Sequence, residues 1–162
     1  YGEIFVAVNK VGASSTSSLR TMEETFMTEC AVLFFPAGLV SRKQNGLVRD
    51  LEWKKSFVTQ AIDHKRMIQP VYIEGENSKF FYNFANFRKK IGIKANIEML
   101  FLPDEMFKAK KATIRIHYSK PFDTSILDSR KTHKQWSDLI YQYIYSPEFM
   151  KGIPFEEYMK AF

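Results

Sequence analysis

The most informative stretch of the chain is Cys30-Ala-Val-Leu-Phe-Phe-Pro-Ala-Gly-Leu-Val-Ser-Arg42. It begins as a short apolar run, which Pro36 and Gly38 end abruptly. A short apolar run bounded by Pro and Gly is typical of an inner strand that stops at the edge of a sheet. Because open α/β sheets bind ligands beyond the carboxyl ends of their strands, we expect a binding loop directly after this strand.

The residues of this loop suit an anionic ligand. Gly38 has no Cβ, so the backbone can turn sharply or approach a ligand closely. Arg42 carries a planar guanidinium that matches phosphate or carboxylate, and Lys43 adds a second cation. Taken alone, the loop favours an ordinary basic connection after a strand, because single short motifs have many chance matches.

Composition sets broad limits on fold and partners. The 162 residues suffice for one domain with a real core, and 45% of them are hydrophobic, as in globular proteins. The formal net charge of +6 suits lipid phosphate, a coenzyme, a membrane surface or nucleic acid. Nucleic acid is supported by charge alone, since the basic residues form no long block, and we expect no nucleic-acid partner. We expect Cys30, the single cysteine, to be a buried hydrophobe in a reducing compartment.

Strand and helix patterns predict an α/β fold with a mostly parallel sheet flanked by helices. Residues 4–8 (Ile-Phe-Val-Ala-Val) form a β-favouring apolar run, and Leu19, Met22 and Phe26 recur at helical spacing. This helix would connect the first strand to the central one, and such crossovers join parallel strands. Residues 67–73 are the next strand candidate, with Pro70 placing it at an edge. Residues 112–118 alternate in polarity, which predicts a strand with one exposed face.

Three further helices are expected. Asp50 can cap a helix whose apolar face includes Trp53, Phe57 and Ala61. A second helix follows a cap at Asn77 or Ser78 and carries the stripe Phe80, Phe84, Phe87 and Ile91, with Phe81 and Tyr82 off it. Thr132 opens the last clear helix, where Gln135 completes a capping box. An aromatic helix followed by Arg88, Lys89 and Lys90 is typical of elements that lie on an anionic membrane, although aromatic stripes are more often core.

Several segments together resemble a known family. Residues 35–42 (Phe-Pro-Ala-Gly-Leu-Val-Ser-Arg) resemble the Phe-Pro-Glu-Gly-Thr-x-Ser block of glycerolipid acyltransferases, in particular their hemolysin/acyltransferase branch. Residues 2–6, followed by Asn9 and Lys10, resemble the block before it, and residues 69–71 (Gln-Pro-Val) resemble the block after it. The resemblance implies a glycerol-phosphate-acyltransferase-like domain over residues 1–121, truncated at its N-terminus. Residues 122–162 would add a helix and tail packed on that domain.

The resemblance also implies where the acceptor binds. Gly38, Ser41 and Arg42 would hold its anionic head, and Asn9 or Lys10 would lie opposite. The full set of implied substrate-binding residues is Asn9, Lys10, Phe35, Pro36, Ala37, Gly38, Ser41, Arg42 and Lys43. The chain departs from the family at Ala37, where glutamate is common, and at Leu39, where threonine is common. Both changes remove polar groups, so a lysophospholipid, glycerol phosphate or an acylated amino-acid lipid all remain open as acceptors.

Catalysis in this family uses a His-x-x-x-x-Asp pair, which lies upstream of the block that residues 2–6 resemble. The histidine takes the acceptor's proton, and the acceptor attacks an acyl thioester directly. We therefore expect the pair upstream of Tyr1, so that this chain alone would be inactive. His133 and Asp138 have the right spacing, but side chains at i and i+5 of a helix point about 140° apart, so we expect no dyad there. We expect no metal and no cofactor, because the histidines are far apart and acyl-CoA or acyl-carrier protein serves as donor substrate.

The sequence thus predicts an acyltransferase of membrane lipid biosynthesis. It would move a fatty acyl group from acyl-CoA or acyl-carrier protein to a glycerophospholipid-type or lyso-lipid acceptor. We expect it in the cytoplasm, peripheral at the inner face of the cell membrane. The alternative is a non-catalytic module that binds anionic lipid or a membrane surface. In either case Phe80, Phe81, Arg88 and Lys89 are the candidates for contact with the membrane.

Overall fold

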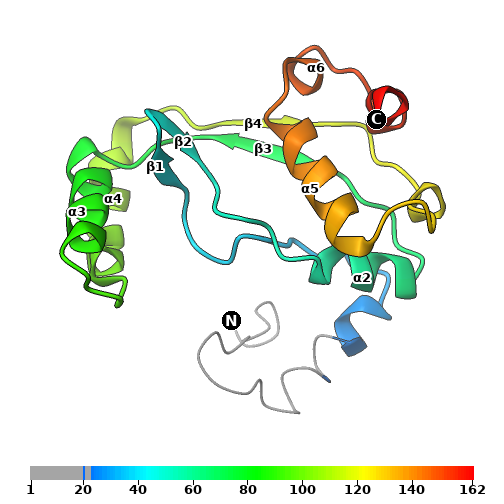
Figure 1. Ribbon diagram of the computed structural model, residues 1–162, viewed down its shortest axis with the longest axis horizontal. Coiled ribbons are helices and arrows are strands. Elements are labelled where there is room, and N and C mark those ends of the chain that lie inside the picture. Colours follow the sequence, from blue (N-terminus) through cyan, green and yellow to red (C-terminus); the bar gives the residue numbers. More distant parts are fainter. Residues whose placement is uncertain (1–19, 21–22) are drawn as a thin grey trace.

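The computed structural model of the chain describes Arg20 and residues 23–162 (Figure 1). The expected strand at residues 4–8 lies outside the described residues. Of the expected helix around Phe26, residues 23–26 are described and helical. The main hydrophobic core of the described residues lies in the later part of the chain, from Trp53 onward.

That core is built around helix α5 (His133–Ile144). The predicted capping box is confirmed, because the Thr132 hydroxyl accepts from Gln135 N–H and the Gln135 side chain accepts from Thr132 N–H at 2.8 Å. The apolar face of α5 is almost fully buried, with Trp136 and Ile140 each 1% exposed and Tyr143 0%. A face this deeply buried makes α5 the element on which its neighbours pack.

Three shorter helices cover α5. Helix α2 (Ser56–Asp63) contributes Phe57 and Val58 to the same cluster. Helices α6 (Pro147–Met150) and α7 (Phe155–Tyr158) add Phe149 and Phe155, followed by the 3₁₀ turn η4 (Met159–Ala161). The 3₁₀ turn η3 (Thr124–Ile126) leads into this region, and the ring of Phe122 stacks on Phe155 at 4.5 Å. Residues 122–162 therefore share one core with α2.

Helix α2 begins later than predicted. It starts at Ser56, its cap position is Lys55, and Asp50 does not cap it. Residues 51–54 are not helical, and Lys54 N–H donates to the carbonyl of Pro36 at 3.2 Å. The predicted cap at Asp50 is wrong because this segment runs alongside the Pro36 loop before the helix can begin.

The strands form two antiparallel pairs. Strands β1 (Arg42–Gln44) and β2 (Leu47–Arg49) form a hairpin, and β3 (Val71–Glu74) pairs with β4 (Arg115–Tyr118). Pro70 lies directly before β3, as expected of an edge position, and its carbonyl accepts from Ser119 N–H at 3.0 Å. No parallel pair occurs within residues 23–162, and the first expected strand lies outside them, so the mostly parallel sheet stays a prediction.

The apolar run before the motif is less buried than predicted. Residues 31–35 belong to no assigned strand, and their exposure alternates, with Leu33 73% and Phe35 65% exposed. Phe34 points the other way and lies 6.1 Å from the ring of Phe57. Cys30 is exposed, so the prediction that it is a buried hydrophobe is wrong. An extended segment covered on only one face accounts for the alternation over residues 31–35, whereas Cys30 lies in the exposed bend before that segment.

A group of helices lies at the other end of the molecule (Figure 1). It comprises α3 (Lys79–Lys90), η1 (Ile97–Phe101), α4 (Leu102–Lys108) and η2 (Ala109–Lys111). We call residues 79–111 the α3–α4 lobe. The predicted cap at Ser78 is confirmed, since its hydroxyl accepts from Phe81 N–H at 3.3 Å and donates to Glu105 of α4 at 2.8 Å. This hydroxyl therefore joins the start of α3 to α4.

The buried face of α3 differs from the one that the stripe suggested. The buried residues are Phe81, Tyr82, Ala85 and Arg88, with Phe81 0% and Arg88 8% exposed. The prediction that Phe81 and Arg88 contact a membrane is therefore wrong, because both lie inside the lobe. Phe80 and Lys89, the other two candidates, are exposed.

Candidate functional site

The motif loop, residues 36–50, turns at Gly38. The φ of Gly38 is +65°, and its N–H donates to the carbonyl of Phe35 at 3.0 Å. Residues with a side chain rarely adopt a left-handed backbone, so the glycine of the motif is required by the turn itself. A ligand is not needed to explain it.

The rest of the loop is the β1–β2 hairpin. Its turn is Asn45-Gly46, with φ values of +50° and +84°. Asn-Gly between two apolar or extended runs is the strongest short signal for a two-residue hairpin. Only a basic connection was predicted here, and the Asn-Gly signal for a hairpin was missed. The hairpin register places Arg42 directly opposite Arg49.

Asp50 holds the base of the loop. Its carboxylate accepts from Ser41 Oγ at 2.6 Å and from Trp53 Nε1 at 3.1 Å. Its N–H donates to the hydroxyl of Tyr145 at 3.0 Å, and its carbonyl accepts from the hydroxyl of Tyr141 at 3.1 Å. Burial raises the pKa of Tyr145, so this phenol stays protonated at neutral pH. Asp50 thus fixes the end of the motif loop against α5.

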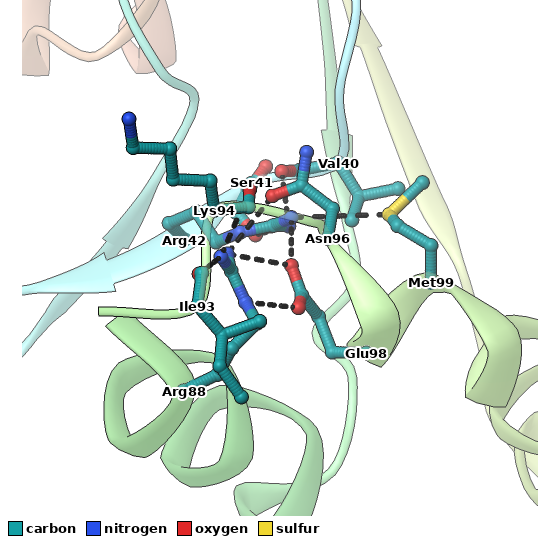
Figure 2. Close-up of polar contacts among 9 residues, drawn as sticks. All are labelled: Val40, Ser41, Arg42, Arg88, Ile93, Lys94, Asn96, Glu98 and Met99. Atoms are coloured by element: carbon teal, nitrogen blue, oxygen red, sulfur yellow. Dashed lines mark hydrogen bonds and ion pairs between the residues drawn. The ribbon is translucent and has the colours of Figure 1, made fainter. Parts of the chain in front are cut away.

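Arg42 points inward from β1 and is only 8% exposed (Figure 2). Its Nη1 donates to the carbonyls of Val40 at 2.8 Å and Ser41 at 3.3 Å. Its Nη2 donates to Glu98 Oε1 at 2.7 Å, and the guanidinium lies 5.6 Å from the centre of the Phe81 ring. The guanidinium is therefore bonded within the chain on several sides.

Glu98 is shared by a second arginine. Its other oxygen, Oε2, forms an ion pair with Arg88 Nε at 2.7 Å, and Glu98 itself is 0% exposed. Arg88 also donates to the carbonyl of Ile93 at 2.6 Å and to Asn96 Oδ1 at 2.9 Å. Two guanidiniums and one carboxylate form what we call the buried ion-pair cluster, Arg42–Glu98–Arg88 (Figure 2). It joins the motif hairpin to the α3–α4 lobe.

Not all predicted site residues can be placed. Asn9 and Lys10 lie outside the described residues. Phe35 and Lys43 are exposed, whereas Pro36, Ala37 and Gly38 are half-buried. Ser41 donates to Asp50, and Arg42 pairs with Glu98. That Ser41 and Arg42 hold an acceptor head stays a prediction, and an acceptor would have to share these groups with Asp50 and Glu98.

An accessible cation lies on β2, the second strand of the hairpin. Arg49 is exposed, and its guanidinium lies 5.2 Å from the centre of the Tyr145 ring. It lines a hollow of about 420 Å³ together with Trp53 and Tyr141. Arg49 is not among the predicted site residues, although the Asn-Gly hairpin signal would have placed it opposite Arg42.

The histidines offer no acyltransferase dyad within the described residues. His133 Nδ1 lies 2.8 Å from Thr59 Oγ1, whereas Asp138 bonds Lys134, which confirms that the two do not pair. His117 Nε2 lies 2.9 Å from Glu74 on the β3–β4 pair, and the hydrogen bond between them lowers the pKa of Glu74. In residues 23–162 no group of three or more His, Cys, Asp or Glu side chains could hold a metal ion. No helix of the described chain has the length and apolar character needed to cross a membrane.

The motif loop is thus held by Asp50 on one side and by the buried ion-pair cluster on the other. Comparison with known proteins decides the family. The sequence model described as "Acyltransferase" matches residues 2–151, and the chain belongs to this acyltransferase family.

Two curated relatives share one description, lyso-glycine lipid O-acyltransferase. A lyso-glycine lipid O-acyltransferase of Bacteroides thetaiotaomicron is 44% identical over 140 residues, which cover 86% of this chain and 52% of the relative. A lyso-glycine lipid O-acyltransferase of Phocaeicola vulgatus is 42% identical over 140 residues, covering 86% of this chain and 50% of the relative. The chain thus spans about half the length of the curated relatives it matches. No solved structure matches it.

Proposed function

We propose that the protein is an O-acyltransferase that moves a fatty acyl group from an acyl thioester to the hydroxyl of a lyso-lipid with an anionic head. A lyso-glycine lipid is the acceptor we favour. The observation that carries the proposal is the 44% identity over 140 residues to a lyso-glycine lipid O-acyltransferase, an alignment that takes in most of this chain. Acyl-CoA and acyl-carrier protein are both suitable donors.

The chemistry at the loop agrees with such an acceptor. The acceptor hydroxyl gives its proton to a base and forms an ester with the acyl carbon. The carbon–sulfur bond breaks, and the sulfur leaves as the donor's free thiol after taking up a proton. The family's His-x-x-x-x-Asp pair would supply that base. In the family this pair lies upstream of the block that residues 2–6 resemble. The described residues would supply binding. A carboxylate head needs cations at the surface, and the hairpin offers Lys43 and Arg49 there.

The loop also lacks polar groups that the glycerolipid acyltransferases carry. Ala37 and Leu39 stand in place of a glutamate and a threonine, and both are half-buried. Ala37 packs against the hydrophobic core. Since these apolar side chains cannot hydrogen-bond the hydroxyls of glycerol, an amino-acid lipid is a better match than glycerol phosphate.

The test is an acyl-transfer assay of the intact protein with three acceptors: lyso-glycine lipid, lysophosphatidate and glycerol 3-phosphate. Each is paired with acyl-CoA and with acyl-carrier protein. We expect the highest kcat/KM with lyso-glycine lipid. Lys43→Ala and Arg49→Ala should each raise the KM for this acceptor several-fold, because a charge-assisted contact contributes about 1.5–3 kcal/mol when well formed and less at an exposed site.

The matched control is Lys151→Ala, which removes an exposed cation beside α6. Its KM for the acceptor should equal that of the unchanged protein. Transfer to glycerol 3-phosphate alone, or no transfer to any acceptor, would overturn the proposed function. Equal KM values for Lys43→Ala, Arg49→Ala and the control would mean that Lys43 and Arg49 do not bind the acceptor.

We also propose that the protein works peripherally at the inner face of the cell membrane. Its acceptor and its product would both be lipids that reside there. Cell fractionation followed by a high-salt or carbonate wash tests this: a peripheral protein stays with membranes at low salt and is released by the wash. Recovery in the soluble fraction at low salt would contradict it.

A further inference from the structure

We propose that the α3–α4 lobe docks on the surface of an anionic bilayer, with the aromatic stripe of α3 lying in the interface. The inference rests on the proposed function, because a lyso-lipid acyltransferase must reach an acceptor held in a membrane. Three features of the lobe support it: an uncovered apolar face, the charge around that face and the connection of the lobe to the motif loop.

Helix α3 has two apolar faces, and only one is covered. Phe80, Phe84, Phe87 and Ile91 recur at helical spacing on one side, and the exposed fractions of Phe80, Phe87 and Ile91 are 51%, 57% and 53%. The residues of the other face are buried within the lobe. Apolar side chains that are exposed together along a helix mark an interaction surface more often than scattered ones do. We call these four residues the α3 stripe.

The α3 stripe continues onto η1, and α4 adds a further exposed aromatic residue to the lobe. The ring of Phe101 meets Phe80 edge-on at 5.3 Å and Phe84 at 5.5 Å, so η1 extends the same aromatic surface. Leu100, the neighbour of Phe101, is 80% exposed, and Phe107 of α4 is 70% exposed. The lobe therefore presents large apolar side chains from three consecutive elements.

The lobe also carries most of the net positive charge of the chain. Residues 79–111 contain eight Lys or Arg and three Asp or Glu, a formal charge of +5 out of +6 for the whole chain. Two of the three acids, Glu98 and Glu105, are buried in ion pairs or hydrogen bonds. The third, Asp104, is exposed and pairs with Lys108 at 2.6 Å. The accessible surface of the lobe is thus strongly cationic, which complements an anionic bilayer.

The lysines lie where an interfacial helix needs them. At 100° per residue, Lys79 and Lys90 lie about 90° around α3 from the stripe. From there their long side chains can reach lipid phosphates while the stripe enters the boundary between headgroups and acyl chains. Nucleic acid would use the lysines but leave the stripe unexplained. A bilayer accounts for both features, so we favour it over other occupants.

Docking of the lobe would bring the motif loop to the membrane. The buried ion-pair cluster joins β1 to α3 and η1 (Figure 2). Asn86 of α3 also donates to the carbonyl of Lys43 at 3.4 Å. A lobe seated on the bilayer would therefore hold the hairpin, with its candidate acceptor-binding cations, close to the lipid surface. The lobe would serve as the support from which the enzyme takes its lipid acceptor.

The experiment measures partition of the intact protein onto vesicles by flotation. Vesicles of phosphatidylcholine are compared with vesicles that contain 30% phosphatidylglycerol, the anionic probe. The double variant Phe87→Ser/Ile91→Ser disrupts the stripe, and Lys90→Glu/Lys94→Glu reduces the charge of the lobe. Matched controls are Met150→Ser, an exposed apolar residue of α6 that is 52% exposed, and Lys151→Glu beside it.

We expect at least a tenfold loss of partition onto anionic vesicles for both lobe variants and less than a twofold change for the controls. Acyl transfer to detergent-dispersed acceptor should stay unchanged in the stripe variant, because none of its residues lies in the motif loop. Unchanged partition of the stripe variant would overturn the inference. So would a concentration-dependent dimer that the stripe substitutions abolish, because a second copy would then cover the face. Protection of Phe87→Cys from a thiol reagent in vesicle-free protein, measured in a Cys30→Ser background because Cys30 is exposed, would overturn it as well.

The same experiment separates the inference from the proposed function. If partition depends on the stripe but the protein transfers no acyl group in detergent, the docking surface is supported and the proposed acyltransferase function is rejected. Acyl transfer in detergent together with partition that does not depend on the stripe would support the proposed enzyme and reject the docking surface.

Discussion

Glu98→Gln is the substitution that tests most directly how the motif loop is held. The side chain is 0% exposed and forms two ion pairs, each with a closest distance of 2.7 Å, to Arg42 and Arg88. The amide keeps the shape of the side chain but removes its charge. Two guanidiniums, each 8% exposed, would then lie close together with no counter-charge.

The expected loss follows from the burial of the cluster. At an effective dielectric constant of about 20, two unit charges about 4 Å apart attract by roughly 4 kcal/mol. Burial of the charges offsets much of this attraction in the intact cluster, but removing one partner leaves the desolvation cost of the others unopposed. Removing one partner of a buried ion pair lowers the free energy of unfolding by about 3–5 kcal/mol. For a chain of this size we expect Tm to fall on the order of 10 °C.

The assay is thermal and urea unfolding of the intact protein, followed by near-UV circular dichroism. Glu74→Gln is the matched control, because Glu74 also faces two basic partners but its side chain is 34% exposed. Exposed pairs contribute about 0–1 kcal/mol, so this variant should be nearly as stable as the unchanged protein. Adding Arg88→Met to Glu98→Gln should recover part of the loss, since one uncompensated charge is removed.

A loss below about 1 kcal/mol for Glu98→Gln would refute the reasoning, because it would mean that the cluster is not desolvated in solution. Failure of Arg88→Met to recover any stability would contradict the explanation by like charge. In the acyl-transfer assay, Glu98→Gln should raise the acceptor KM more than it lowers kcat, because it loosens the loop and touches no reacting atom.

Three further predictions concern single contacts. Asp50→Ala should cost about 1–3 kcal/mol, because a hydroxyl and an indole N–H lose their acceptor; urea unfolding measures the loss. Thr132→Ala should cost about 1 kcal/mol through the lost cap of α5, and Thr132→Ser should restore most of it. The hydrogen bond from His117 holds the pKa of Glu74 below its ordinary value of 4.5. The ionised Glu74 carboxylate therefore stabilises the fold fully above pH 4.5, and this stabilisation is lost as pH falls through the folded-state pKa. Any Tm difference between Glu74→Gln and the unchanged protein should therefore shrink on going from pH 6 to pH 3, and a difference that grows would contradict the sign.

Local signals in the sequence predicted local structure well. The cap at Ser78 and the capping box at Thr132 are both present, because each depends on residues within three positions of one another. The hairpin at Asn45-Gly46 was predictable in the same way and was missed. Asp50 shows where local reasoning fails. Its type suits a helix cap, but its partners Tyr141 and Tyr145 are more than 90 residues away.

The sequence by itself determined the family and the motif, since a run such as Phe35-Pro-Ala-Gly requires no knowledge of distant contacts. It also determined that α3 is a helix with aromatic residues around most of its circumference. Only the tertiary structure decided which of these aromatics are buried and that Arg42 faces Glu98. The physical reason is that an apolar side chain is equally suited to core and to interface, and a charge to solvent and to a buried pair. The choice depends on what other elements bring against it, and for Arg42 the partner stands 56 residues away.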